Sequence, residues 1–453
     1  MRGNLHPGQL LVISFFCAIM VGTAMLTLPA SSAGAPLSVV DALFTATSAT
    51  CVTGLIVVDT AVDLTSFGQG VVLALIQLGG LGIMTFTSLL LLFAGRRFSF
   101  KDEEVLTESF GDMSGLAAKV IVSRLFLFVL IVEFLGALAL FPVFIGDMGA
   151  SRAIYTAIFH SISAFCNAGF SIFSNSLVAY RNNLWLNGVI MTLIILGGTG
   201  FVVFSDLWGS FYHWRKKRGA FKLSLHSKTV LFMTVMLIFG GAALIATLEW
   251  KNGFRGFSLG ERITAALFQS VTTRTAGFNT IDIGSLTDAS LFLCIILMFI
   301  GAGPGSCAGG VKTSTVAVVL ALFWGRIRGF TKVSLFKRSI PDVVVNRAVA
   351  ILVLSFVFTV SMTFLLLLFE SHLVPHNLER QEWFLELMFE VVSAFGTVGL
   401  STGVTPELSP LGKLILTFVM FTGRLGPLTL ALALGKNRAK GEFSYAEENM
   451  MVG

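Results

Sequence analysis

Long apolar runs separated by short polar segments occupy most of the chain. Residues 9–30 and 64–95 contain no charged side chain, and about 20 mostly apolar residues are enough for one helix to cross a bilayer. Further runs lie near 124–146, 185–208, 228–248, 290–324, 348–369 and 411–435. The pattern predicts an all-α membrane protein with eight transmembrane helices. The first run is longer than the apolar core of a secretory signal, so we interpret it as a retained helix.

Composition supports a membrane location and argues against other classes. Hydrophobic residues make up 55% of the chain and the mean hydropathy is +0.85, whereas soluble domains contain about 45–50% apolar residues. The five cysteines form no CxxC pair, and the six histidines are scattered. Neither a zinc site nor a disulfide framework is therefore indicated.

The basic residues are distributed unevenly between the two ends of the predicted helices. When the apolar runs cross the membrane alternately, 21 of the 31 Lys and Arg residues fall on one side and 7 on the other. The positive-inside rule then places both termini in the cytoplasm. Clusters such as residues 215–218 are explained as topology signals, so we expect no nucleic-acid partner. The predicted location is the cytoplasmic, or inner, membrane.

A short motif recurs four times between the apolar runs. It begins at a Phe and ends at a Gly that follows by ten residues in three copies and by nine in the third. The copies are Phe44–Gly54, Phe159–Gly169, Phe268–Gly277 and Phe389–Gly399. Gly-rich clusters that start at Gly79, Gly197, Gly301 and Gly423 follow the loop glycines by 25, 28, 24 and 24 residues. Two marks in one register indicate an internal repeat.

Each repeat contains the same sequence of parts. An apolar run comes first, then a segment of about 10–14 residues that ends at the loop glycine, then a second apolar run. The middle segment is too short to span and is typical of a re-entrant helix with a returning loop. The predicted repeats are residues 1–94, 95–208, 209–324 and 325–435, followed by a cytosolic tail at 436–453. We expect them to surround one central pore with pseudo-fourfold symmetry.

Glycine-bearing loops around one axis suit a dehydrated monovalent cation. Their carbonyl oxygens replace its hydration shell, as in potassium filters, and the short helix before each loop directs the negative end of its dipole at the ion. The predicted filter residues are Val52, Thr53, Gly54, Asn167, Ala168, Gly169, Thr275, Ala276, Gly277, Thr397, Val398 and Gly399. A simple turn is the alternative for any single loop, but it does not explain four matched positions.

The second apolar run of the third repeat is interrupted. Gly and Pro are unfavourable inside a helix, so we predict a partly unwound segment below the filter that acts as an intramembrane gate; a static kink is the alternative. The predicted gate residues are Gly301, Gly303, Gly305, Ser306, Gly309, Gly310, Lys312 and Arg424. In the first two repeats we expect the Gly clusters to serve close packing of helices.

Two ionisable residues lie inside apolar runs. Arg424 is near the middle of the last run, where a charge is costly enough to imply a function. It either raises the electrostatic barrier to cations or pairs structurally. Glu133 lies in the first run of the second repeat, and we expect it to make an internal hydrogen bond rather than take part in transport.

On these residues the chain resembles the Trk/Ktr/HKT superfamily of potassium transporters, most closely its KtrB type, from about residue 9 to 435. The resemblance rests on the four loop glycines, the string Arg274–Phe278, the Gly-rich interruption at 301–310 and Arg424. It implies potassium selection by the filter glycines, since plant relatives with Ser at the position of Gly54 favour sodium. It also implies that the interruption is a gating loop with Arg424 as the positive charge beneath the filter.

The resemblance further implies an assembly. KtrB-like subunits form homodimers with one pore in each subunit, on a cytosolic ring of RCK-type regulatory subunits that bind nucleotides. That ring would be a separate polypeptide, because the chain contains no GxGxxG after a strand. The gating loop departs from the usual Ser- and Thr-rich composition at Ala302, Pro304 and Cys307.

Other functions remain as alternatives. A TrkH-type transporter or a sodium-coupled cation symporter would use similar motifs, so Na⁺ stays a second candidate ion beside K⁺. A transporter working by alternating access would contain larger repeats with broken helices at the midplane. An enzyme would need a buried nucleophile with its base or a metal cluster, and no such set is apparent. We therefore expect no enzymatic activity.

Overall fold

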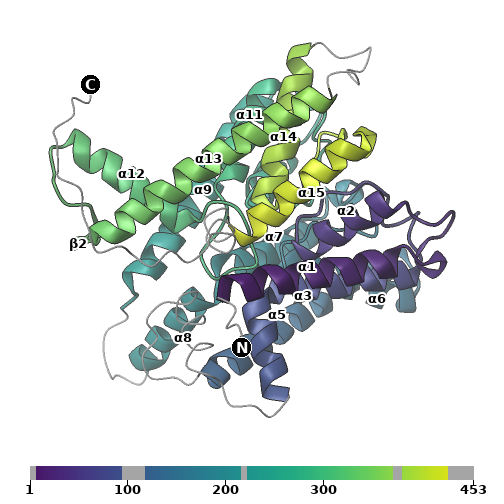
Figure 1. Cartoon of the computed structure of the whole chain (residues 1–453), viewed down its shortest axis with the longest axis horizontal. Helices are drawn as coiled ribbons and strands as arrows, with labels where there is room; N and C mark the ends of the chain where they lie inside the picture. The colour runs from purple at the N-terminus through teal and green to yellow at the C-terminus, as the bar shows by residue number, and fades with distance from the viewer. Residues whose placement is uncertain (1–6, 94–117, 216–221, 371–379, 427–453) are drawn as a thin grey trace, which may run out of the picture.

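The computed structural model describes residues 7–93, 118–215, 222–370 and 380–426, and within them the chain is mostly helical (Figure 1). The predicted tail at 436–453 and part of the basic cluster at 215–218 lie outside the described residues. The α-helices are α1 (Pro7–Leu26), α2 (Val39–Thr50), α3 (Ser66–Phe93), α5 (Ala118–Asp147), α6 (Ala150–Phe165), α7 (Leu184–Thr199), α8 (Phe201–Arg215), α9 (Leu225–Glu249), α10 (Leu259–Thr272), α11 (Asp288–Phe299), α12 (Thr313–Ile327), α13 (Asp342–Glu370), α14 (Arg380–Gly396) and α15 (Pro410–Leu425).

The remaining elements are short. Three turns of 3-10 helix are η1 (Pro29–Ser31), η2 (Val178–Tyr180) and η3 (Thr405–Glu407). The strands β1 (Ser334–Leu335) and β2 (Arg338–Ser339) form one antiparallel hairpin in which Ser334 pairs with Ser339. The hairpin connects α12 to α13.

Several helices are apolar enough to cross a membrane. Among the described residues, Ser123–Asp147, Leu225–Glu249 and Asp342–Glu370 meet the length and hydropathy of a span by themselves. The pair α7 and α8 meets them only when both are counted, and it bends by 95° at its break. Shorter apolar helices include Val12–Leu26 and Asp288–Phe299. The chain is thus a helical protein with several membrane-spanning candidates, and the predicted number of eight transmembrane helices stays a prediction.

The four short helices α2, α6, α10 and α14 pack alike, and two of them begin with a serine cap. Ser38 and Ser258 cap α2 and α10 through their side chains, which satisfies free N–H groups of the first turn. Each short helix packs against the long helix before it, in the pairs α1 with α2, α5 with α6, α9 with α10, and α13 with α14. The order helix, short helix, helix therefore recurs along the chain.

Contacts between these units form a closed cycle. The short helix of one unit packs against the helix that follows the loop of the preceding unit, in the pairs α3 with α6, α7 with α10, α11 with α14, and α15 with α2. The last pair joins the yellow C-terminal helix to the purple N-terminal part of the chain (Figure 1). Lys413 Nζ lies 2.8 Å from Asp41 Oδ1 across it. The ends of the sequence are thus brought together at one interface.

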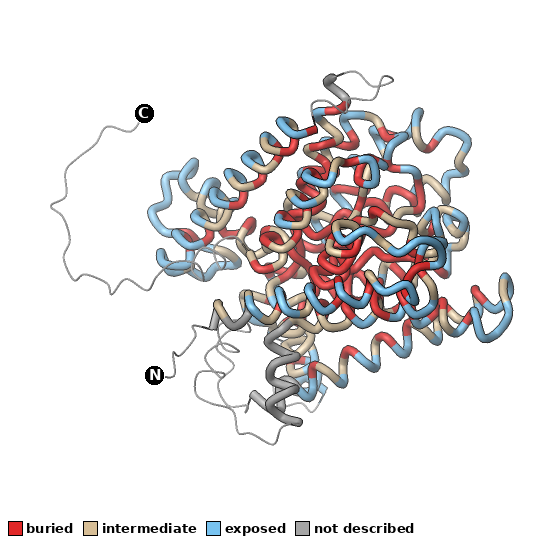
Figure 2. The backbone as a smooth tube through the Cα atoms, turned by 45° about the vertical axis from the view of Figure 1, so that its right-hand side comes forward, coloured by how far each residue is buried: buried red, intermediate tan, exposed pale blue. Residues whose placement is uncertain are grey.

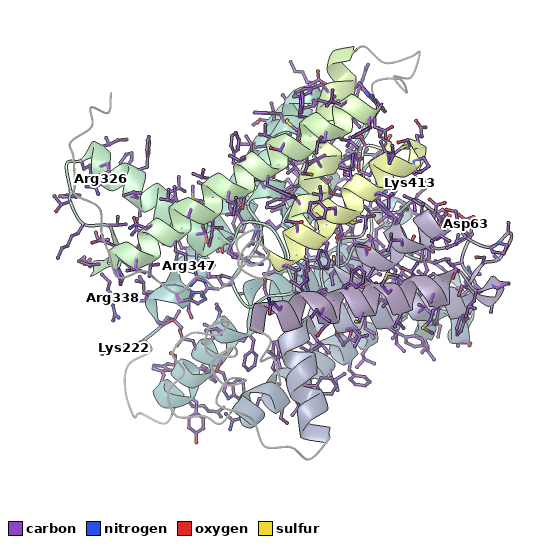
Figure 3. All side chains as sticks on the ribbon, viewed as in Figure 1. Asp63, Lys222, Arg326, Arg338, Arg347 and Lys413 are labelled. Carbon is purple, nitrogen blue, oxygen red and sulfur yellow. The ribbon has the colours of Figure 1, made fainter. Side chains whose placement is uncertain are left out.

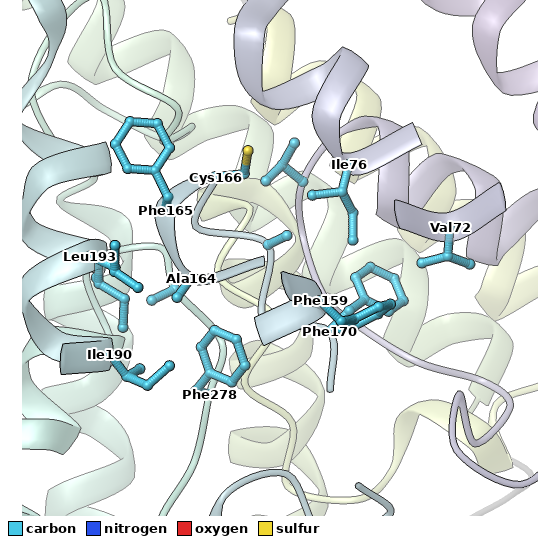
Figure 4. Packing of buried hydrophobic residues seen from close by; sticks show 14 of the residues in the cluster. Val72, Ile76, Phe159, Ala164, Phe165, Cys166, Phe170, Ile190, Leu193 and Phe278 are labelled. Carbon is cyan, nitrogen blue, oxygen red and sulfur yellow. The ribbon is translucent and has the colours of Figure 1, made fainter. Parts of the chain in front are cut away.

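The core lies in the middle of the molecule and exposed residues lie on the outer helices (Figure 2). The Phe that opens each loop motif is fully buried, at positions 44, 159, 268 and 389. Phe159 packs in one cluster with Phe170 and Phe278, which follow the loop glycines of two units (Figure 4). Burying an aromatic side chain stabilises the fold by about 1.5–3 kcal/mol, so the motif residues hold neighbouring loops together.

Breaks occur in more of the second helices than the sequence analysis anticipates. Gly82 interrupts α3 with a φ of 73°, and Gly200 separates α7 from α8 with a φ of 90°. The first glycines of these clusters do serve packing, because a Cβ at Gly79 would meet the backbone of Thr50 and one at Gly197 that of Phe165. Packing alone therefore does not account for the clusters, since their last glycine turns the chain.

Candidate ion-binding loops and the segment beneath them

The four loop glycines lie next to one another in a ring. A Cβ added at Gly54 would meet the backbone of Gly169, and one at Gly169 would meet that of Gly277. One at Gly277 would meet Gly399, and one at Gly399 would meet Gly54, which closes the cycle. We call the twelve residues that end at these glycines the filter loops; they are Val52–Gly54, Asn167–Gly169, Thr275–Gly277 and Thr397–Gly399. A side chain in the ring would overlap a neighbouring loop.

The backbone of each filter loop alternates in handedness. The φ values of the four glycines are 89°, 70°, 79° and 90° in chain order, a region that L-residues with a side chain rarely adopt. The residue two positions earlier is also left-handed, namely Val52 (57°), Asn167 (59°), Thr275 (66°) and Thr397 (50°). Successive carbonyls of an extended strand point in opposite directions. When every second residue is left-handed, the carbonyl groups of successive residues point to the same side of the loop.

A hydroxyl group from each short helix braces its loop. Ser48 Oγ donates to Leu55 O at 2.7 Å and accepts from Gly54 N at 3.1 Å. Ser163 donates to Phe170 O at 2.7 Å, and Thr272 donates to Phe278 O at 2.6 Å. Ser393 accepts from Gly399 N at 3.1 Å. The loops are therefore held by equivalent contacts from inside their own unit.

These bracing hydroxyls are functional candidates that the sequence analysis missed. Each lies four residues after the Phe that opens the motif, at positions 48, 163, 272 and 393. That spacing is visible in the aligned repeats beside the recurring Phe and Gly. A small hydroxyl at the same place in all four copies was the available signal.

Several buried hydroxyls at the filter loops lack a protein partner. Among the described residues, Thr53, Thr275 and Thr397 each bury an Oγ1 atom that makes no hydrogen bond within the chain. An unpaired buried hydroxyl costs about 1–3 kcal/mol. Water or a cation beside the loops would satisfy these oxygens.

Seven of the eight predicted gate residues lie in a long loop between α11 and α12, and the eighth, Arg424, lies on α15. The two ends of the loop are joined to each other, because Gly301 N donates to Val311 O at 2.9 Å and Thr313 N donates to Ala302 O at 3.1 Å. Its middle is attached to α7, through Gly303 N to Gly198 O at 2.9 Å and Cys307 N to Gly197 O at 3.2 Å. We call residues 301–312 the α11–α12 loop.

The loop is tightly turned and passes close to the filter. Gly305 and Gly310 have φ values of 69° and 65°. Within the loop, Ser306 Oγ accepts from Ala308 N at 3.3 Å. A Cβ added at Gly309 would overlap the side chain of Thr397. The α11–α12 loop therefore lies against the filter loop that contains Thr397.

Two cationic side chains bind the carbonyls of this loop. Lys312 Nζ donates to Ala308 O at 2.5 Å, so it folds back on its own loop. Arg424 reaches it from α15, with Nη1 donating to Cys307 O and Nη2 to Gly79 O on α3. The flat guanidinium thus connects three segments that are distant in sequence. Arg424 therefore makes a structural pairing, one of the two expected roles.

Glu133 makes the internal hydrogen bonds expected from the sequence. The side chain is buried on α5, and Gln77 Nε2 donates to its Oε2 at 3.0 Å. The Cys166 thiol lies 3.7 Å from its Oε1. The predicted internal hydrogen bond is confirmed, because Gln77 on α3 and Cys166, the residue after α6, contact the carboxyl group.

Comparison with known proteins decides the family. A family model described as TrkH, cation transport protein, matches residues 4–444 of the 453-residue chain. The chain belongs to the TrkH family. This agrees with the resemblance drawn from the loop glycines, and it places the chain in a family of cation transporters, which is not an enzyme family.

Two potassium-related uptake proteins resemble the chain over nearly its whole length. The potassium/sodium uptake protein NtpJ of Enterococcus hirae is 39% identical and covers 100% of this chain and 98% of its own. The Ktr system potassium uptake protein B of Bacillus subtilis is also 39% identical, over 99% of this chain and 97% of its own.

A solved structure shares the fold. The potassium transporter TrkH from Vibrio parahaemolyticus superposes with a TM-score of 0.72, over 96% of this chain and 86% of its own. Its sequence identity is 19%, so the likeness concerns the fold alone. The family assignment therefore rests on the sequence match, and the solved structure supports the fold.

Proposed function

We propose that this chain takes up potassium across the cytoplasmic membrane through a channel-like pore. The observation that carries the proposal is the closed ring of loop glycines, each left-handed and each against the next. Backbone oxygens around such a ring match the coordination that potassium filters supply. The uptake proteins of Enterococcus hirae and Bacillus subtilis, whose names include potassium, support the same ion.

The pore in this proposal is surrounded by eight transmembrane helices in four repeats with pseudo-fourfold symmetry. The cyclic packing that ends with α15 against α2 supports it. The repeats are the predicted residues 1–94, 95–208, 209–324 and 325–435. Both termini face the cytoplasm, a topology supported by the concentration of Lys and Arg on one side of the helices.

The α11–α12 loop is the gate in this proposal. Residues with positive φ, contacts with Thr397 and carbonyls held by Lys312 and Arg424 support a segment that closes the path below the filter. Deleting residues 303–309 should raise potassium flux in a chain that still folds. A lower flux from a folded deletion variant would remove the basis for a gate.

The proposed assembly is a KtrB-type homodimer on a ring of RCK-type regulatory subunits that bind nucleotides. The Ktr system proteins among the relatives support it, since their names assign them to a multi-component system. Co-purification of a nucleotide-binding partner from the native membrane would test the ring. Mass photometry of the chain alone would test the dimer.

Growth and flux test the central proposal. The chain is expressed in a bacterium that lacks potassium uptake, and growth is compared in media of decreasing potassium content. Rescue of growth is expected, together with accumulation of radioactive rubidium in vesicles that contain the purified chain. Absence of both in a folded, membrane-inserted protein would contradict the proposal.

Selectivity is tested at the first filter glycine. Gly54→Ser is expected to weaken discrimination between potassium and sodium, because the Cβ overlaps the backbone of the next loop. The matched control is Gly34→Ser, where nothing lies within 4 Å of an added Cβ. An unchanged ion ratio in a folded Gly54→Ser protein would contradict a filter at this glycine.

Sodium is the second candidate ion. The potassium/sodium uptake protein NtpJ favours it by name. Radioactive sodium uptake by the same vesicles, with and without potassium, separates shared transport from potassium transport alone.

A further inference from the structure

Two buried cysteines from distant parts of the chain meet at one glycine of α3. Cys166 directly follows α6 and precedes the filter loop Asn167–Gly169 (Figure 4), and Cys307 lies in the α11–α12 loop. Cys307 Sγ donates to Gly80 O at 3.2 Å, and a Cβ added at Gly80 would overlap Cys166 Sγ. The two side chains also share a hydrogen bond. Gly80 thus leaves the space in which the two sulfur atoms touch.

The other cysteines are arranged differently. Cys51 occupies the position of Cys166 in the first unit, directly after α2, and it is also buried. The Cys294 thiol accepts from a glutamine amide at 3.8 Å, and Cys17 is exposed on α1. Among the described residues, Cys166 and Cys307 are the cysteines whose side chains contact each other.

The pair connects the α11–α12 loop to the unit that carries the second filter loop. The backbone of Cys307 is held by hydrogen bonds alone, because its N donates to Gly197 O at 3.2 Å and its O accepts from Arg424. Cys166 N donates to Ile162 O at 2.9 Å inside the last turn of α6. Hydrogen bonds break and reform in thermal motion, whereas an S–S bond would hold the loop until it is reduced.

Charged groups near the pair suit it to thiol oxidation. Arg424 donates to the Cys307 carbonyl through Nη1, and the positive charge of Lys312 also acts on the Cys307 thiol. Thiolates, which are the nucleophiles in this chemistry, form most readily next to cations. The Cys166 thiol lies 3.7 Å from Glu133 Oε1, an oxygen that can accept its proton. Cys307 is therefore the attacking residue and Cys166 the resolving one.

A cavity gives small molecules access to the α11–α12 loop. Its volume is about 1230 Å³, and Pro304 and Lys312 of this loop line it together with parts of α8, α9, α12 and α13. Lys222 and Arg347 also line the cavity and lie at the same end of the molecule (Figure 3). The positive-inside rule assigns such an end to the cytoplasm. Hydrogen peroxide is little larger than water, so it can reach the loop from this side.

We propose that Cys166 and Cys307 form a reversible disulfide bond when a hydroperoxide enters from the cytosolic side. An S–S bond of about 2.05 Å is shorter than the thiol contact, so the α11–α12 loop moves slightly toward α6 and is locked in the closed arrangement. The lock rests on the proposed function, because it requires the loop to be a gate. Formation of the bond does not depend on transport.

The reaction balances with one hydrogen peroxide for each pair. The Cys307 thiolate attacks one peroxide oxygen, an S–O bond forms, the O–O bond breaks, and the departing hydroxide takes up the proton that the thiol released. Cys166 Sγ then attacks the sulfenic acid, an S–S bond forms, and the S–O bond breaks. The oxygen leaves as water with the Cys166 proton, which Glu133 can relay. The two thiols are oxidised by two electrons, and the peroxide is reduced to two waters.

Peptide mapping of the full chain tests the bond. Vesicles that contain the purified chain are treated with hydrogen peroxide, free thiols are alkylated, and cross-linked peptides are identified by mass spectrometry. We expect a peptide pair that joins Cys166 to Cys307 and disappears after dithiothreitol. Rubidium uptake by the same vesicles should fall as the cross-linked fraction grows and return after dithiothreitol. Absence of the peptide pair at peroxide concentrations that oxidise the exposed Cys17 would overturn the proposal.

Serine variants separate the lock from other oxidation. Cys166→Ser and Cys307→Ser should each prevent the cross-link and the peroxide-dependent loss of uptake, measured against the untreated uptake of the same variant. The matched control is Cys51→Ser, which removes a buried thiol at the equivalent position of the first unit and should respond to peroxide like the original chain.

Two results would overturn the lock. They are a loss of uptake that persists in Cys307→Ser and a complete cross-link with unchanged uptake. If the untreated chain takes up no rubidium but still forms the cross-link, the proposed function fails and the disulfide bond stands.

Discussion

The filter loops and the α11–α12 loop are both Gly-rich, left-handed in places and non-helical, yet they are held in different ways. A hydroxyl within the same unit braces each filter loop, as Ser48 does for Gly54 and Leu55. The α11–α12 loop is attached instead to other elements, through Gly197 and Gly198 of α7 and through Arg424 of α15. Short-range support favours one rigid arrangement, whereas a few long-range contacts permit release.

The largest expected effect comes from filling the ring of glycines. Gly399→Ala should abolish rubidium uptake and destabilise the fold, because its Cβ overlaps the backbone of Gly54 and its φ is 90°. The left-handed backbone costs about 1–2 kcal/mol and overpacking adds about 1–3 kcal/mol. Uptake by vesicles and thermal unfolding measure the two effects.

Gly403 provides the control for that variant. Its φ is 104°, but nothing lies within 4 Å of an added Cβ. Gly403→Ala should therefore carry the backbone strain alone and retain uptake. If both variants lose uptake equally, backbone strain and not the closeness of the loops is responsible.

A bracing hydroxyl should come next in effect. Ser48→Ala removes two hydrogen bonds of a buried loop and should lower the free energy of unfolding by about 1–3 kcal/mol, with poorer potassium selectivity. Ser48→Thr should restore both, since Thr272 makes the equivalent contact in the third unit. Denaturation and ion competition in vesicles measure the outcome.

The control for the bracing hydroxyl is Thr192→Ala. Thr192 donates to Gly188 O at 2.7 Å on the exposed part of a helix, away from the loops. Selectivity should not change in this variant. Normal stability and selectivity in Ser48→Ala would contradict a bracing role for the Ser48 hydroxyl.

Releasing the α11–α12 loop should have a smaller effect, of opposite sign. Arg424→Gln loses charged hydrogen bonds worth about 1.5–3 kcal/mol, so basal flux should rise, by up to about tenfold for each 1.4 kcal/mol by which the closed arrangement is weakened. Arg424→Lys distinguishes the two roles of the residue. Arg424→Lys keeps the positive charge but loses the bridge between the carbonyls of Cys307 and Gly79. If Arg424 anchors the loop, this variant should show raised flux. If Arg424 is an electrostatic barrier, flux should stay normal.

The Lys413–Asp41 pair offers a control on the same helix. Lys413→Gln breaks an ion pair of α15 away from the loop, and flux should remain normal. Raised flux in this variant would mean that any disturbance of α15 opens the path.

Glu133→Gln should have the smallest effect. The amide keeps a hydrogen-bonding group beside Gln77 and conserves volume, so the change in unfolding free energy should stay near or below about 1 kcal/mol. Uptake at several pH values should match the unchanged chain. A clear loss of uptake with normal stability would assign Glu133 to transport after all.

Sequence periodicity was sufficient for the filter loops but not for what supports them. Two marks in one register identified all four loop glycines, because glycine reports directly on close approach and positive φ. Val52 and Asn167 also have positive φ although they are not glycine. Their residue types did not predict this backbone conformation. The handedness of these residues comes from bonds that the folded loop makes.

Long-range contacts could not be predicted from one sequence. Arg424 was a candidate because a charge inside an apolar run is costly. Its carbonyl partners at Cys307 and Gly79 are 117 and 345 residues away in the chain. The break at Gly200 was likewise hidden, since a glycine that packs against a neighbour and a glycine that turns the chain look alike in a sequence.

The ring of glycines is built from one polypeptide, and this has a genetic consequence. In a channel assembled from four identical chains, one codon change alters every position of the ring at once. Here Asn167 occurs in one loop only, while Val52, Thr275 and Thr397 occupy the matching places. Mutation can therefore adjust one quarter of the ring at a time, so ion preference can evolve in small steps.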